Sequence, residues 1–224
     1  MRARGSGRRF VRAWVALAFA SGLGVALACG SAARTRAVYL LVDTSGTYAG
    51  EVDKAGRVAT YLLGKLRSGD SLALGRIDSA SFSEKNVVAK TTFDSRPSFA
   101  NQQKRAFERE IAAFVAGVER SRYTDVTGGV MQAAEWLRET GAARHTILLF
   151  SDLEEDLRPG DVRDFGVDLA GIDVVAINVT KLSSDQVDPR EYGARLARFR
   201  ERVERGGGGF RVLNDLERLD RALD

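Results

Sequence analysis

The chain has 224 residues, of which 44% are hydrophobic and 29% charged, with a formal net charge of +4. This size and balance are typical of one globular domain with a buried core, and leave little room for a second full domain. The positive charge does not point to nucleic acid, and we predict no nucleic-acid partner, because residues 1–28 hold five arginines and no acidic residue. Removing these five charges takes the formal net charge from +4 to −1, which excludes a strongly basic mature chain.

Residues 1–28 have the parts of an export signal: an arginine-rich start, an apolar run from 13 to 28, and small residues before a cysteine. The apolar run is short for a helix that spans a membrane. Arg8 and Arg9 resemble a twin-arginine signal, but ordinary secretion fits equally, so the export route stays open. We predict that residues 1–28 are a signal peptide.

Cys29, the only cysteine, follows that segment directly. Residues 25–29 resemble a bacterial lipoprotein cleavage box, although Ala26 and Ala28 also fit a general signal peptidase cutting at the same bond. We expect lipidation of Cys29, because a lone cysteine cannot form an internal disulfide. The chain would then be a membrane-anchored lipoprotein of the cell envelope, facing the periplasm or in the outer membrane, and otherwise a secreted protein. We predict that residues 29–35 are a tether and that residues 36–224 form the domain.

Two patterns alternate along the domain. Apolar, β-branched runs predict strands at residues 37–42, 72–77, 87–93, 146–150, 172–179 and 210–213. Apolar residues at helical spacing predict helices within 52–66, 107–118, 130–137 and 196–203. Asn214 and Glu217 form a predicted capping box for a last helix that ends near Leu223. The alternation predicts an α/β fold: a doubly wound, mostly parallel six-stranded sheet with helices on both faces.

In such a sheet, ligands bind beyond the carboxyl ends of the strands. Asp43, Ser45 and Thr47 follow the first predicted strand, Asp152 follows the fourth, and Thr124 precedes a predicted helix. Carboxylates and hydroxyls without a nearby imidazole or thiolate form an oxygen-only set. This set suits Mg²⁺, Mn²⁺ or Ca²⁺ and disfavours zinc or copper.

The order of these residues, over nearly all of 36–224, resembles the metal-ion-dependent adhesion site (MIDAS) of a von Willebrand factor type A (vWA) domain. The resemblance implies a Rossmann-like vWA fold. It implies that Asp43, Ser45, Thr47, Thr124 and Asp152 hold Mg²⁺, or Mn²⁺ or Ca²⁺. It also implies that an acidic residue of a protein partner completes the coordination, so that the domain is a protein-binding module and not an enzyme.

Thr124 is chosen over Thr127 because the loop pattern of the family also requires the aliphatic Val126 and the small Gly129. On its own, Thr124 or Asp125 would be interpreted as a helix cap. Thr47 stands where the family more often has serine.

Leu153 follows Asp152 where the family usually has glycine. A leucine disfavours positive φ, so we expect a different path for this loop. Residues 154–156 are all acidic, and we interpret them as a solvated loop.

Two alternatives stay open. One is an envelope scaffold with a degenerate, metal-free site. The other, ranked third, is a hydrolytic enzyme. The single histidine, His145, lies at the amino end of the fourth predicted strand, opposite the expected ligand edge, and we interpret it as structural.

Overall fold

The computed structural model describes residues 35–46, 48–163 and 166–223. The predicted signal peptide, Cys29, most of the tether and Thr47 lie outside these residues. Arg34–Asp224 is one compact unit of the chain. Among the described residues, none of the helices has the length and apolar character needed to cross a membrane.

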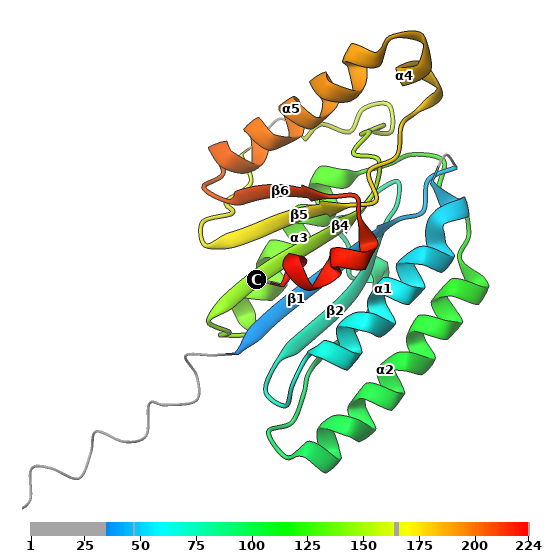
Figure 1. The fold of residues 1–224 in the computed structure, drawn as a ribbon. Coiled ribbons are helices and arrows are strands. Elements are labelled where there is room, and N and C mark those ends of the chain that lie inside the picture. Colours follow the sequence, from blue (N-terminus) through cyan, green and yellow to red (C-terminus); the bar gives the residue numbers. More distant parts are fainter. Residues whose placement is uncertain (1–34, 47, 164–165, 224) are drawn as a thin grey trace, which may run out of the picture. The chain divides into compact units, whose positions relative to one another are not determined.

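A six-stranded sheet forms the centre of the domain, with strand order β3-β2-β1-β4-β5-β6 (Figure 1). All neighbouring pairs are parallel except β2 and β3, which are antiparallel. The strands are β1 Arg36–Asp43, β2 Ser71–Ile77, β3 Val87–Thr92, β4 Arg144–Phe150, β5 Ile172–Ile177 and β6 Gly209–Leu213. The predicted six-stranded, mostly parallel sheet is therefore confirmed.

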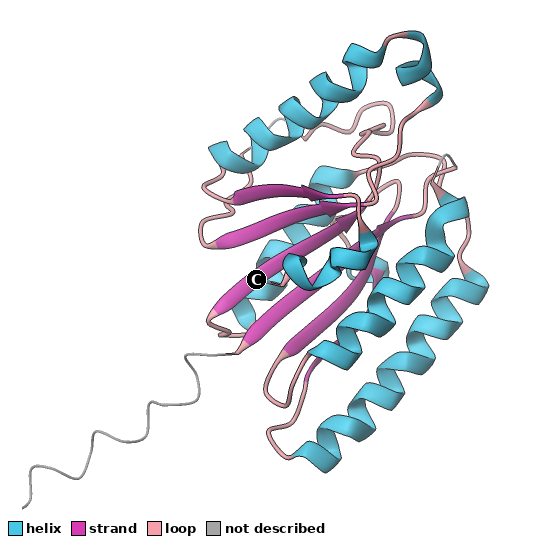
Figure 2. Ribbon diagram, viewed as in Figure 1, coloured by secondary structure: helices cyan, strands magenta, loops and turns pink. Residues whose placement is uncertain are grey.

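Helices cover both faces of the sheet (Figure 2). On one face lie α1 (Val52–Lys65), α2 (Pro97–Gly117) and the 3₁₀ helix η4 (Leu216–Ala222); on the other lie α3 (Val126–Glu139) and α5 (Pro189–Arg205). Successive side chains of β1 alternate between the faces: Leu40 packs with α1 and α2, whereas Leu41 packs with α3. Because both faces are covered, β1 is apolar from Ala37 to Val42 and β4 from Ile147 to Phe150.

Three short helical segments were not predicted: η2 (Ala49–Glu51), η3 (Glu84–Asn86) and α4 (Ser183–Val187). The predicted capping box of the last helix is wrong. Asp215 caps η4 by accepting a hydrogen bond from the Glu217 amide at 3.0 Å, whereas the Asn214 side chain accepts one from the Val179 amide at 2.8 Å. The Asn214 side chain is thus bound to the segment that follows β5, and Asp215, the next residue, caps η4 instead.

The carboxyl ends of β1 and β4 meet in the middle of the sheet. Val42 pairs with Phe150, so that Asp43 and Ser151 leave the sheet side by side. The strand order runs outward in opposite directions from this pair, through β2 on one side and β5 on the other. Such a reversal opens the crevice in which doubly wound sheets bind their ligands. The fold therefore places two of the predicted ligand segments at its natural binding edge.

Candidate metal site at the carboxyl edge of the sheet

Asp43, the last residue of β1, is completely buried. One carboxylate oxygen accepts a hydrogen bond from the Ser45 amide and the other from the Ser151 hydroxyl, both at 2.8 Å. Burial, together with the nearby Asp152 carboxylate, raises the pKa of Asp43 to about 6, although the two hydrogen bonds act in the opposite direction. A nearby positive charge would therefore stabilise the ionised form of Asp43.

Asp152 follows β4 by two residues and is 1% exposed. Its carboxylate accepts a hydrogen bond from the Glu154 amide, and its backbone carbonyl accepts one from Arg195 Nε, both at 2.9 Å. The turn is closed by a further bond, from the Leu153 amide to the Ser151 hydroxyl. The Asp152 carboxylate lies close enough to Asp43 to raise the pKa of Asp43.

Leu153 has a φ of 66°, the left-handed conformation that glycine adopts readily. The expectation that leucine resists this conformation is therefore wrong here. The Leu153 side chain is buried in the core beneath α3, and this burial favours the strained backbone.

The loop before α3 lies against both of these turns. Ser45 forms an isolated parallel bridge with Ser121, whose amide donates to the Thr44 carbonyl at 2.8 Å. Thr124 is buried, and its backbone exchanges two hydrogen bonds with that of Asp156, of 2.7 and 3.0 Å. Thr124 is therefore held between the segments that follow β1 and β4.

The amide and the hydroxyl of Thr127 are both bound to residues outside the candidate metal site. Its amide donates to Glu155 Oε1 at 2.8 Å, and its hydroxyl accepts a hydrogen bond from Arg202. This arrangement agrees with the choice of Thr124 as the candidate ligand. It also shows that Glu155 pairs with Arg202, so the interpretation of residues 154–156 as simply solvated fits the half-exposed Glu154 but is wrong for Glu155.

Asp125 caps α3 and also forms a buried ion pair. Its carboxylate accepts from the Gly128 amide at 2.8 Å and from the Ser81 amide at 3.0 Å. Arg163 binds both oxygens, with Nε at 3.0 Å and Nη2 at 2.8 Å. A Cβ at Gly128 would lie 2.4 Å from the carboxylate, so a residue without a side chain is required there. Asp125 is neutralised by protein groups and is not a candidate metal ligand.

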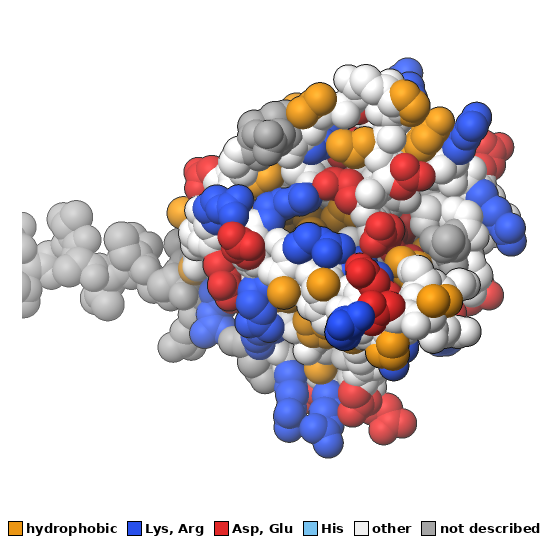
Figure 3. All heavy atoms as spheres, turned by 90° about the horizontal axis from the view of Figure 1, so that it is seen from above, with side chains coloured by type: hydrophobic (Ala, Val, Ile, Leu, Met, Phe, Trp, Pro, Cys, Tyr) orange, Lys and Arg blue, Asp and Glu red, His pale blue; other side chains and the backbone are white. Residues whose placement is uncertain are grey.

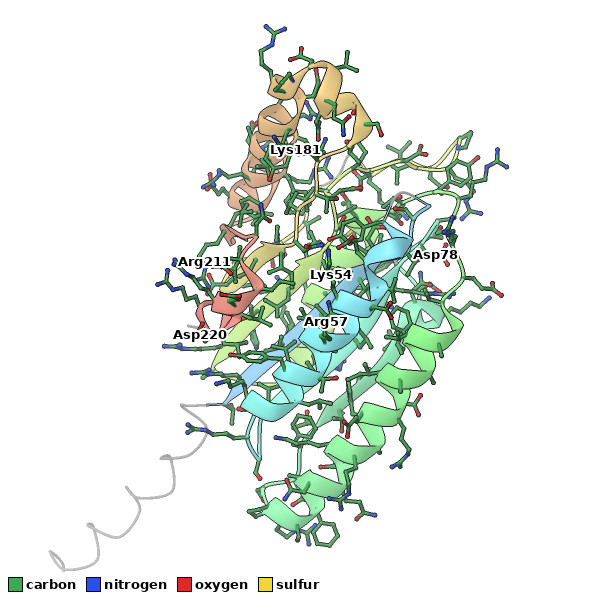
Figure 4. The ribbon with its side chains drawn as sticks, turned by 45° about the vertical axis from the view of Figure 1, so that its right-hand side comes forward. Lys54, Arg57, Asp78, Lys181, Arg211 and Asp220 are labelled. Atoms are coloured by element: carbon green, nitrogen blue, oxygen red, sulfur yellow. The ribbon has the colours of Figure 1, made fainter. Side chains whose placement is uncertain are left out.

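Asp78 is a further acidic residue at this edge that the sequence analysis missed; Figure 4 labels it just after β2. It accepts a hydrogen bond from the Ser121 hydroxyl at 2.6 Å. Partial burial acts to raise its pKa, but the hydrogen bonds from Ser121 and Ser79 and the Arg76 guanidinium outweigh it and lower the pKa. Asp78 therefore anchors the loop that carries Thr124.

A buried ion pair behind Asp152 was also missed. Arg195 of α5 is 4% exposed and binds both oxygens of Asp185, at 3.0 and 2.8 Å, while its Nε reaches the Asp152 carbonyl. Arg195 lies four residues before Phe199 and eight before Val203, within the apolar stripe of α5. An arginine on a core-facing stripe was the signal that could have revealed this pair.

The arrangement provides two buried carboxylates, from Asp43 and Asp152, with the hydroxyl-bearing residues Ser45 and Thr124 nearby. Each carboxylate has about four lone-pair positions, so oxygens that already accept a hydrogen bond can still bind a cation. In the described part of the chain, no three His, Cys, Asp or Glu side chains are grouped to hold a metal ion. An ion at this edge would depend on hydroxyl oxygens as well as on the two carboxylates, and the donor set fits a hard divalent cation.

No model of a known protein family matches the sequence, and no curated protein is significantly similar to it. Solved structures are similar in fold. A von Willebrand factor type A protein from Catenulispora acidiphila matches with a TM-score of 0.52 and 12% identity, over 84% of this chain and 41% of that chain. This chain has the vWA fold.

The pilus adhesin SpaC from Lactobacillus rhamnosus GG, in an open conformation, matches with a TM-score of 0.50 and 10% identity. The match covers 85% of this chain and 29% of the adhesin. The chain thus corresponds to less than half the length of either protein. At these identities the similarity shows the vWA fold alone.

Proposed function

We propose that this chain is a cell-envelope vWA domain that binds a divalent metal ion and, through it, a protein partner. Asp43, Ser45, Thr124 and Asp152 would hold the ion, with Thr47 as a further ligand outside the described residues. Mg²⁺ is the expected ion, and Mn²⁺ or Ca²⁺ would suit the same oxygen donors. An acidic residue of the partner would fill the remaining coordination position.

The observation that carries this proposal is the pair of buried carboxylates where the strand order reverses. Asp152 contributes to the raised pKa of Asp43, so the two acids repel each other in a buried environment. A divalent cation between them would convert this repulsion into attraction and would favour the ionised form of both. Neither acid needs the cation for folding, because serine and backbone donors already hold both side chains.

A binding role is supported by the fold and by the surface. The same fold occurs in a pilus adhesin. On the face seen in Figure 3, Lys and Arg side chains are interspersed with Asp and Glu. Such a mixed surface suits recognition of a protein better than binding of a polyanion.

Thermal unfolding of the purified protein tests the metal site. At pH 7.5, above the Asp43 pKa of about 6, we expect 1 mM Mg²⁺, Mn²⁺ or Ca²⁺ to raise Tm relative to chelator. At a hundred times Kd, a ligand adds ~2.7 kcal/mol to the free energy of unfolding. For a domain of this size that amounts to about 5–10 °C.

Asp43→Asn keeps the side-chain volume and removes the charge, so it should abolish the rise in Tm. Asp53→Asn makes the same change at an exposed position of α1 and should leave the rise intact. No rise with any of the three ions, or an equal rise in Asp43→Asn, would overturn the metal site. That result would support the alternative, an envelope scaffold with a degenerate, metal-free site.

Partner binding needs a separate measurement. The protein is used as bait for the envelope fraction of its source, with metal or with chelator. We expect one partner that is captured only with metal and is lost with Asp43→Asn. Capture that is equal in chelator would contradict a role for the ion in the interface. A hydrolytic enzyme remains the third candidate, and a hydrolytic activity that Asp152→Ala abolishes would support it.

A further inference from the structure

A pocket of about 230 Å³ lies beside α3, over β1 and the antiparallel end of the sheet. It shares no lining residue with the candidate metal site. The residues that matter for its chemistry are Tyr39, Glu84, Lys90, Glu135, Trp136 and Glu139. Pockets that enclose a whole small molecule usually measure ~300–1,000 Å³, so this one suits a group the size of a single side chain.

The Tyr39 hydroxyl is the most informative atom of the pocket. Tyr39 is completely buried, and its oxygen has no hydrogen-bond partner among the described residues. The ring packs edge-on against Trp136, with centroids 5.7 Å apart. A Cβ at Gly75 would lie 2.7 Å from the hydroxyl oxygen, so the oxygen occupies space that only glycine leaves open. A phenylalanine would fill the core without the cost of an unsatisfied polar atom, so the hydroxyl is unexplained by packing.

The walls of the pocket carry an excess of negative charge. Glu84 is paired with Lys90 at 3.0 Å, whereas neither Glu135 nor Glu139 forms an ion pair within the described residues. These two glutamates lie four residues apart on α3, a spacing at which like charges repel. They also lie in the carboxyl-terminal half of the helix, where the helix dipole adds further negative potential. The pocket therefore favours a cation.

We infer that this pocket binds an organic cation, a guanidinium or primary ammonium group on an apolar stem. Its N–H groups would donate to the oxygen of Tyr39, which has no hydrogen-bond partner among the described residues. Its charge would be compensated by Glu135 and Glu139, and the Trp136 ring offers a surface for cation–π contact. Aromatic walls and the small volume suit such a group better than a hydrated metal ion. This inference is independent of the proposed metal site.

Fluorescence of Trp136 can report occupancy directly. The chain has two tryptophans, and Trp14 lies in the predicted signal peptide, so the mature chain, residues 29–224, has Trp136 alone. We expect N-acetyl-arginine amide to change this fluorescence saturably, with Kd on the order of 1 mM for so small a ligand. N-acetyl-citrulline amide, of the same length but uncharged, should give no saturable change. Equal responses to both compounds, or no saturable response to either, would overturn the inference.

Variants separate binding from folding. Tyr39→Phe removes only the unpartnered hydroxyl, so we expect Tm to stay or rise while Kd weakens by about fivefold. Glu135→Gln with Glu139→Gln should weaken Kd by about tenfold or more. Glu108→Gln with Glu110→Gln makes the same charge change on the exposed side of α2 and should leave Kd unchanged. An unchanged Kd in both pocket variants would place the ligand elsewhere.

The cation could belong to a free amine or to a side chain of a protein, and agmatine distinguishes these sources. Agmatine has the same guanidinium on an apolar stem but a free amine in place of the blocked peptide groups. Binding of N-acetyl-arginine amide at least as tightly as agmatine would support an arginine side chain of a partner. Tighter binding of agmatine would support a small free amine. Either result requires the same cation pocket.

Discussion

At Leu153, backbone strain and side-chain burial act in opposite directions on one residue. A φ of 66° costs a non-glycine residue ~1–2 kcal/mol. The side chain is 4% exposed, and removing a buried leucine side chain costs ~2.7–5 kcal/mol. Burial therefore outweighs strain, and leucine is tolerated where glycine would relieve the backbone.

The two effects can be separated by two substitutions. Leu153→Gly should lower the free energy of unfolding by ~2 kcal/mol, because lost burial exceeds the relieved strain. Leu153→Ala should cost ~1 kcal/mol more than Leu153→Gly, because alanine keeps the strain and loses most of the burial. At an ordinary position the order of the two variants is reversed. Urea denaturation measures both, and an alanine variant more stable than the glycine variant would contradict the account.

The acidic residues near the candidate site differ in whether their partners could be predicted from the sequence. Asp43 and Asp152 could be predicted as a pair because each follows a strand, and parallel strands bring their carboxyl ends together. Asp125 stands in an equally suggestive sequence position, but Arg163, 38 residues away, neutralises it. The difference between a candidate ligand and an ion-paired cap lies in contacts that are distant in sequence.

Among the elements, α3 bears most directly on the candidate site. Its cap, Asp125, immediately follows Thr124, and the same carboxylate binds Arg163 of the segment after β4. The first turn of α3, the Thr124 loop and the segment after β4 therefore share one buried acid. The position of Thr124 should depend on this cluster.

Asp125→Asn and Asp125→Ala separate the cap from the ion pair. Asparagine caps helices about as well as aspartate, because its one oxygen can still accept from the Gly128 amide. Asp125→Asn should therefore lose the negative charge and the bonds that the Ser81 amide and Arg163 Nη2 donate to the other oxygen, ~2 kcal/mol of the free energy of unfolding. Asp125→Ala loses the cap as well, for a total of ~3 kcal/mol. Asp53→Asn on the exposed face of α1 should change stability by less than ~0.5 kcal/mol. Equal stability of the asparagine and alanine variants in urea would show that the cap contributes nothing.

The end of β5 differs from the end that the apolar pattern predicts. The predicted strand at 172–179 was too long, because Asn178 turns the chain with a φ of 54° and β5 ends at Ile177. The side-chain amide of Asn178 donates hydrogen bonds to the Tyr48 hydroxyl and to the Glu51 carboxylate. These bonds hold the turn against the start of α1. Apolar character continues past the end of the strand, so the sequence pattern alone did not show the turn.

On the scale of the whole molecule, the two candidate binding regions of the domain differ in their chemistry. The carboxyl edge offers buried oxygen donors, whereas the pocket beside α3 offers aromatic walls and glutamates. A vWA-fold domain with both regions would bind one partner through an acidic residue of that partner, which coordinates the metal ion. It would bind a second, positively charged group in the pocket beside α3. The Tm and fluorescence measurements report on the two regions separately.

The attachment of the whole chain to a membrane is a prediction that rests on Cys29. In a bacterial host we expect the protein in the membrane fraction, with an acylated cysteine at its mature amino terminus by mass spectrometry. Cys29→Ser should move it to the soluble envelope fraction or block its processing, whereas Ser31→Ala should leave it at the membrane. An identical distribution of all three proteins, with an unmodified cysteine in the parent, would contradict lipidation.

The sequence by itself determined the order of strands and helices, the covered sheet and the position of the oxygen donors after β1 and β4. These features follow from local patterns: apolar runs, helical stripes, and polar residues at strand ends. The tertiary structure decided the antiparallel direction of β3, the left-handed Leu153, the partners of Asp125 and Asp152, and the unpartnered hydroxyl of Tyr39. Each of these depends on groups that folding brings together from distant parts of the chain, and the spacing of residues within one segment carries no record of such contacts.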